Sequence, residues 1–110
     1  MTSDPRTVAY IVDQASAAGA VSARPMFGEY GVYCDGKMIA IVGEDLLFMK
    51  ATAGGRAHAA DAEERPPYPG AKPCLLIDPG RWDDRDWLAE LFRATAAELP
   101  APKPKRRRQA

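Results

Sequence analysis

The sequence predicts an α+β protein, a two-layer sandwich in which an antiparallel sheet carries an N-terminal and a C-terminal helix on one face. Two amphipathic stretches with helical spacing lie towards the ends of the chain, and between them apolar residues alternate with a period of two around an Asp-Gly pair. Hairpin-linked strands between terminal helices give this class of fold. We expect a three-strand meander plus one or two further strands.

The first amphipathic stretch predicts a helix over residues 5–18. Asp4 is a typical N-cap, Pro5 suits the first helical position, and Gly19 ends the helix. So short a helix is marginal alone and needs a sheet to cover its apolar face, which consists of Val8, Ile11, Val12, Ala15 and Ala18.

The middle of the chain predicts the meander. A hairpin turn at Asp35-Gly36 separates a strand that ends at Cys34 from the apolar run 37–42, and a second turn leads to a third strand over 46–50. The residues that alternate in the first strand are Tyr30, Val32 and Cys34. Just before them, we expect Met26 and Phe27 to anchor this strand in the core, and Gly28 and Gly31 to allow turns or a bulge.

The second half of the chain predicts one more strand and a closing helix. Gly54-Gly55 interrupts the pattern, the alanine-rich segment 56–64 predicts a short helix, and the prolines of 66–70 predict a loop. Residues 74–77 predict a strand. Asp83 or Asp84 then caps a helix that ends before Pro100 and whose shared face consists of Trp87, Leu88, Leu91, Phe92 and Thr95.

Charge divides the chain into a folded domain over 1–99 and a tail over 100–110. Five of the fifteen basic residues lie in the last eight positions, so the acidic residues outnumber the basic ones by five over the rest of the chain. The tail is rich in proline, basic and free of aromatic residues, and we expect it to be disordered.

No apolar run approaches the roughly 20 residues that span a bilayer. We expect a cytoplasmic protein with no membrane association.

The sequence contains no recognisable catalytic, metal or cofactor constellation. The one histidine, His58, has no second histidine beside it, and we expect it on the solvated side of a helix. Cys34 and Cys74 lack redox or zinc spacing, so we expect buried free thiols. The carboxylates of residues 83–86 lie at a helix start, where capping accounts for them. We therefore expect no enzyme, no metal and no cofactor.

A set of short motifs resembles the N-terminal domain of the TfoX/Sxy family, named for bacterial regulators of DNA-uptake competence. The matching residues are Arg24-Pro25-Met26-Phe27-Gly28, the hairpin Asp35-Gly36-Lys37-Met38, the strand Leu47-Phe48-Met49-Lys50 and the element Tyr68-Pro69-Gly70-Ala71-Lys72-Pro73. The resemblance covers roughly residues 5–98. It implies an α+β sandwich, here without the C-terminal helical domain of the regulators, and it implies fold more than function.

The leading functional hypothesis is a non-enzymatic regulatory domain that acts by protein contacts. The expected interaction surface borders the Met-Phe-Gly motif, and the unidentified partner is a protein. Its candidate residues are Arg24, Met26, Phe27, Gly28, Glu29, Tyr30 and Lys50. Arg24 and Glu29 also form a potential exposed ion pair.

Two alternatives stay open from the sequence. A nucleic-acid accessory protein would attach by its tail, through Lys103, Lys105, Arg106, Arg107 and Arg108. A small-ligand or enzymatic site near Arg24 and Tyr30 is the other alternative. An uncovered sheet edge also suggests a homodimer.

Overall fold

The computed structural model describes residues 3–99, and the tail with its predicted nucleic-acid contacts lies outside the described residues. The helices are α1 (Pro5–Gln14), α2 (Ala53–His58) and α3 (Arg85–Glu98), with short 3₁₀ turns η1 (Ser16–Ala18) and η2 (Pro79–Arg81). Asp4 caps α1 and Asp84 caps α3, as the sequence predicts. The first helix ends four residues early because the Ser16 hydroxyl donates to the Asp13 carbonyl and the chain tightens there.

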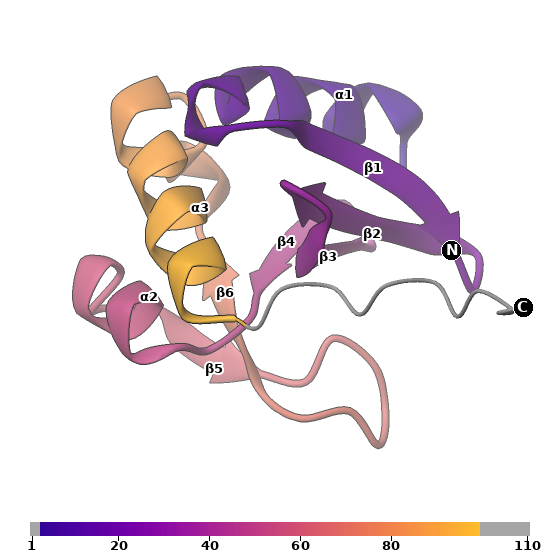
Figure 1. The fold of residues 1–110 in the computed structure, drawn as a ribbon. Coiled ribbons are helices and arrows are strands. Elements are labelled where there is room, and N and C mark those ends of the chain that lie inside the picture. Colours follow the sequence, from indigo (N-terminus) through magenta and orange to yellow (C-terminus); the bar gives the residue numbers. More distant parts are fainter. Residues whose placement is uncertain (1–2, 100–110) are drawn as a thin grey trace, which may run out of the picture.

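One six-stranded antiparallel sheet forms the second layer, in the order β1-β2-β3-β4-β6-β5 (Figure 1). The predicted fold class is confirmed. The strands are β1 (Val21–Met26), β2 (Glu29–Cys34), β3 (Lys37–Gly43), β4 (Leu46–Met49), β5 (Glu63–Arg65) and β6 (Cys74–Ile77).

The sheet has six strands, one or two more than the four or five that the sequence predicts. β1 is an edge strand in which exposed and half-buried residues mix, and the segment Glu63–Arg65, expected to be helical, is the exposed strand β5. The helix α2 instead includes Gly54 and Gly55, which the sequence presents as breakers. The turn and the bulge expected from Gly28 and Gly31 are both present: Gly28 lies in the β1–β2 turn, and the register shift follows Gly31, between Val32 and Tyr33.

Glycine suits α2 because this helix packs closely on α3. A Cβ atom added to Gly54 would clash with a Glu98 carboxylate oxygen, and one added to Gly55 would lie 3.1 Å from the Thr95 hydroxyl. The Glu98 carboxylate accepts hydrogen bonds from the Ala53 amide, at 3.1 Å, and from the Gly54 amide. It thereby supplies partners for the free N–H groups at the start of α2.

The core lies between the helices and one face of the sheet. Ile11 of α1 and Phe92 of α3 are fully buried against strand residues that include Val32, Leu47 and Ile77. Cys34 belongs to this core, whereas Cys74 is buried outside it. Both thiols are free, as expected, and burial raises the pKa of each.

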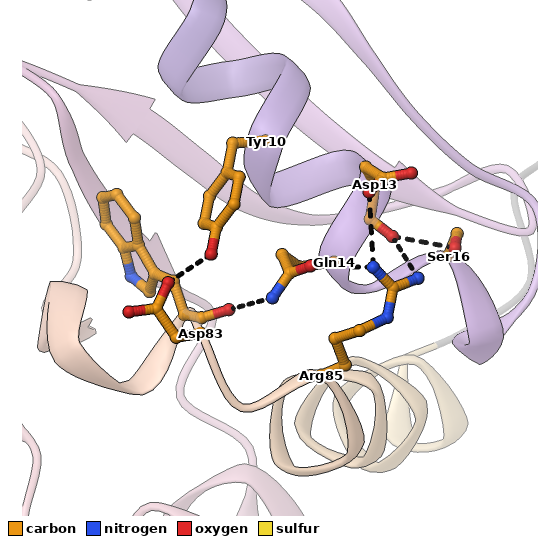
Figure 2. A network of polar contacts seen from close by, with 7 residues as sticks. Tyr10, Asp13, Gln14, Ser16, Asp83 and Arg85 are labelled. Atoms are coloured by element: carbon orange, nitrogen blue, oxygen red, sulfur yellow. Dashed lines mark hydrogen bonds and ion pairs between the residues drawn. The ribbon is translucent and has the colours of Figure 1, made fainter.

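A polar network fastens α1 to the start of α3 (Figure 2). The Gln14 amide donates to the Trp82 carbonyl at 2.9 Å and accepts from Arg85 at 2.8 Å, and Arg85 also reaches Asp13. The Tyr10 hydroxyl donates to the Asp83 carboxylate, which raises the pKa of Tyr10. These polar groups therefore satisfy each other's hydrogen bonds, and they have a structural role in the helical layer.

Candidate functional site

The sheet face that points away from the helical core carries an apolar surface of its own. In the strand register Arg24, Gly31, Ile41, Phe48 and Leu76 are successive partners across five strands, and they lie on the face opposite Val32 and Leu47. We call this side the outer face. Phe48 is only 5% exposed although it lies outside the core cluster, so part of the outer face is covered.

Two methionines border the middle of the outer face. A Cβ atom added to Gly31 would lie 3.2 Å from the sulfur of Met38 and 3.6 Å from that of Met26. Glycine at this position lets flexible, polarisable side chains from β1 and β3 approach the strand between them. The neighbouring Tyr33 ring carries the Arg24 guanidinium 5.0 Å from its centroid.

Two adjoining hollows run over this face, and we call them together the outer-face groove. The first, of about 740 Å³, lies between the β1–β2 turn and the 67–69 segment. The second, of about 540 Å³, continues past Lys50 towards Leu99. Both hollows are lined by Ile41, Pro67 and Tyr68.

Phe27 stands at one end of the groove in an unusual conformation. It forms the two-residue β1–β2 turn with Gly28, and both have positive φ, 48° and 81°, as in a type I′ turn. A bulky residue in this region is an outlier. The expectation that Met26 and Phe27 anchor the strand in the core is wrong. The Phe27 side chain is 92% exposed because the turn carries the ring outward, and the half-buried Met26 lines the first hollow.

Glu29 holds this end of the groove in place. Its carboxylate accepts the amides of Ser3, at 2.8 Å, and of Glu44, at 2.9 Å. Burial raises the pKa of Glu29, but the hydrogen bonds from Glu44 and Ser3 outweigh it and leave the pKa below its ordinary value. Glu29 therefore stays ionised at neutral pH and ties the start of β2 to the β3–β4 turn.

The two ends of the groove differ in charge. Glu29 and Glu44 line the end beside Phe27, and Lys50 and Lys72 line the other. Within residues 3–99, neither lysine ammonium has an ion-pair partner. Arg56 at the same end is already paired with Glu64 at 2.9 Å.

The structure brings most of the predicted surface residues together along the groove, and two of them, Tyr30 and Arg24, line neither hollow. Met26, Phe27, Gly28 and Glu29 line the first hollow and Lys50 lines the second. Tyr30 pairs with Val42 and packs on the core, so it lies on the other face of the sheet. Arg24 stacks on Tyr33 and has no ion pair with Glu29 in the described part of the chain.

Three further residues, Ile41, Tyr68 and Glu44, line the groove and were not among those predicted from the sequence. Ile41 sits in a continuous apolar run, where only the register distinguishes the outer face from the core. Tyr68 was a detectable signal, because an aromatic residue between prolines in a loop has no strand or helix to bury it. His58 also differs from expectation: it is half-buried in α2 and stacks on Trp87, with ring centroids 5.0 Å apart.

Comparison with known proteins assigns the family. The family model described as the TfoX N-terminal domain matches residues 13–99, which is most of the chain. The chain belongs to this family. A similar protein, an uncharacterized 12.7 kDa protein in the trpE 5′ region of Spirochaeta aurantia, is 37% identical over 106 residues. The match covers 96% of this chain and 91% of the relative, so the two proteins are similar over nearly their whole lengths.

The described part of this TfoX N-terminal domain contains neither a cluster of potential metal ligands nor a membrane-spanning helix. Over residues 3–99, no three acidic, histidine or cysteine side chains are grouped so that they could hold a metal ion. The same range includes no helix with the length and hydropathy of a membrane span. What distinguishes its surface is the outer-face groove, which is apolar along its length and charged at both ends.

Proposed function

We propose that this chain is a non-enzymatic protein-interaction domain that binds an extended segment of a partner protein in the outer-face groove. The observation that carries the proposal is Phe27, a large aromatic side chain held 92% exposed at positive φ above the groove. Strained residues cluster at functional sites, and exposed aromatic residues are typical anchors of interfaces. The family suggests that the interaction serves regulation, as in the competence regulators for which it is named.

Other groove residues support a polypeptide as the ligand. Tyr68 is 50% exposed between two prolines, opposite the flexible side chains of Met26 and Met38. Aromatic-lined grooves bind extended, proline-containing segments, and methionine adapts to varied partners. The groove has methionine side chains on the sheet side and proline and tyrosine side chains on the other.

Photo-crosslinking from position 27 tests the proposal. The full chain would carry p-benzoylphenylalanine in place of Phe27, and a matched control would carry it in place of Arg6, whose side chain is 91% exposed on α1. We expect position 27 to give a saturable adduct with one protein in cells, mapped to an extended segment, and position 6 to give none. Equal labelling from both positions, or no adduct from position 27, would contradict the proposal.

A second candidate function follows from the basic tail. Five cations within residues 103–108 suit phosphate contacts on nucleic acid. Duplex DNA binding by the full chain, followed by fluorescence anisotropy, would then show a log–log salt slope of about −4.5 and vanish in a 1–99 truncation. No binding by either form would leave protein contact as the function.

A further inference from the structure

The charges at the two ends of the outer-face groove define the chemistry of the segment that fits it. This inference rests on the proposed function and adds the identity of the ligand. One end carries Glu44, whose carboxylate has no ion-pair partner among the described residues, and the other carries Lys50 and Lys72. A ligand with charge of a single sign would meet repulsion at one of these ends.

The ends are separated by a length that strand geometry fixes. Lys50 lies beside Ile39, since the Lys50 amide donates to the Ile39 carbonyl at 2.9 Å, and Glu44 directly follows the end of β3. The five residue-to-residue steps from Ile39 to Glu44 span about 17 Å at roughly 3.3 Å per step. An extended or polyproline chain, which rises about 3.1 to 3.4 Å per residue, covers that length in about five positions.

The wall between the ends is apolar. Ile41 and Met38 form the floor on the sheet, and Pro67 and Tyr68 stand opposite. Glu29 adds negative charge at its end, but both of its carboxylate oxygens already accept amides, so Glu44 is the carboxylate there that is more open to a cation. The contacts left open are thus a carboxylate for a cation, two ammonium groups for an anion, and hydrophobic surface between them.

We propose that the groove recognises an extended polypeptide segment of a partner protein that carries an acidic and a basic side chain about five positions apart, with apolar residues including proline between them. The acidic side chain meets Lys50 and Lys72, and the basic one meets Glu44. Both end contacts are exposed to solvent, so each contributes selectivity more than affinity and weakens with salt.

End-capped fluorescent peptides test this assignment on the full chain. The peptide DLPLPR places the two charges five positions apart, QLPLPQ removes them, and LPDRLP keeps the composition but makes the charges adjacent. We expect DLPLPR to bind about tenfold more tightly than either control at low salt, and the difference to shrink at 0.5 M salt. Equal affinities for the three peptides would overturn the assignment.

A charge swap gives an independent arm. Glu44→Lys should weaken binding of DLPLPR and strengthen binding of DLPLPD. Lys50→Glu should weaken binding of DLPLPR and strengthen binding of RLPLPR. Circular dichroism confirms that each variant is folded. Failure of both swaps to change the preferred peptide overturns the inference. Should all peptides bind equally and Ile41→Glu abolish binding, the groove remains a peptide site and only the charge rule fails. If no peptide binds, the charge rule also fails, and the crosslink from position 27 remains the test of the proposed function.

Discussion

The carboxylate of Glu29 accepts the backbone amide of Glu44 at a distance of 2.9 Å, which joins the start of β2 to the β3–β4 turn. Through its second oxygen the same carboxylate holds the Ser3 amide, and the Ser3 hydroxyl accepts the Asp45 amide at 2.9 Å. One half-buried anion thus fixes the acidic end of the outer-face groove. Its ionisation links the stability of the domain to pH.

The first prediction concerns that linkage. Because the folded-state pKa of Glu29 lies below its ordinary value of 4.5, the carboxylate stabilises the fold above about pH 5, and this contribution is lost as pH falls through the folded-state pKa. Glu29→Gln should destabilise the protein at pH 7, because an amide –NH₂ would face a backbone N–H. Urea unfolding of both proteins should show the difference narrowing below about pH 4.5. A difference that does not change between pH 7 and pH 3 would contradict the role.

The second prediction concerns the start of α2. Glu98→Ala removes the acceptor of the Ala53 and Gly54 amides and should lower the free energy of unfolding by about 0.5 to 2 kcal/mol, the usual range for a lost cap. Amide hydrogen exchange should show faster exchange in α2 with little change in β2. Glu90→Ala on the same helix is the control, since among residues 3–99 the Glu90 carboxylate accepts a hydrogen bond from Arg93 and from no group of α2.

The third prediction concerns a buried hydroxyl. Thr95 is fully buried, and its Oγ1 is without a hydrogen-bond partner among the described residues. Thr95→Val keeps the shape and removes the unsatisfied group, so it should raise the free energy of unfolding by about 1 kcal/mol. Thr95→Ser keeps the hydroxyl and loses a methyl group, and should lower it. Destabilisation by valine in thermal unfolding would show that the hydroxyl has a partner after all.

The fourth prediction concerns the conformation of Phe27. Asparagine tolerates positive φ far better than phenylalanine, and the exposed ring contributes little packing. Phe27→Asn should therefore raise the free energy of unfolding by about 1 kcal/mol. Gly28→Ala, at φ 81° with open space around it, should lower it by a similar amount, which would verify the turn.

The sequence predicts those elements whose signal is local. The Asp35-Gly36 hairpin, the caps Asp4 and Asp84 and the strand at 74–77 all follow from neighbouring residues. β5 has three exposed residues and exists because β6 offers it a partner, so no hydrophobic period reveals it. Helix α2 depends on a carboxylate 44 residues away in sequence.

The groove was only partly predictable for the same reason. The Met-Phe-Gly motif and Lys50 pointed to it, but the bulge between Val32 and Tyr33 changes which residues of β3 face outward. Two consecutive residues, Ile39 and Ala40, are consequently buried, and Ile41 turns to the outer face. Period-two alternation cannot anticipate such a step. Hydrophobicity alone places Phe27 in the core. The positive φ that turns its ring outward cannot be read from the sequence.

The most direct test of the central claim is co-purification of the crosslinked partner with the wild-type chain, Phe27→Asn and the control Arg6→Ala, at matched protein concentrations. The account predicts that Phe27→Asn is at least as stable as wild type and yet loses most of the partner, while Arg6→Ala retains it. Full partner recovery by a folded Phe27→Asn protein would contradict the claim that the exposed ring is the anchor of the groove.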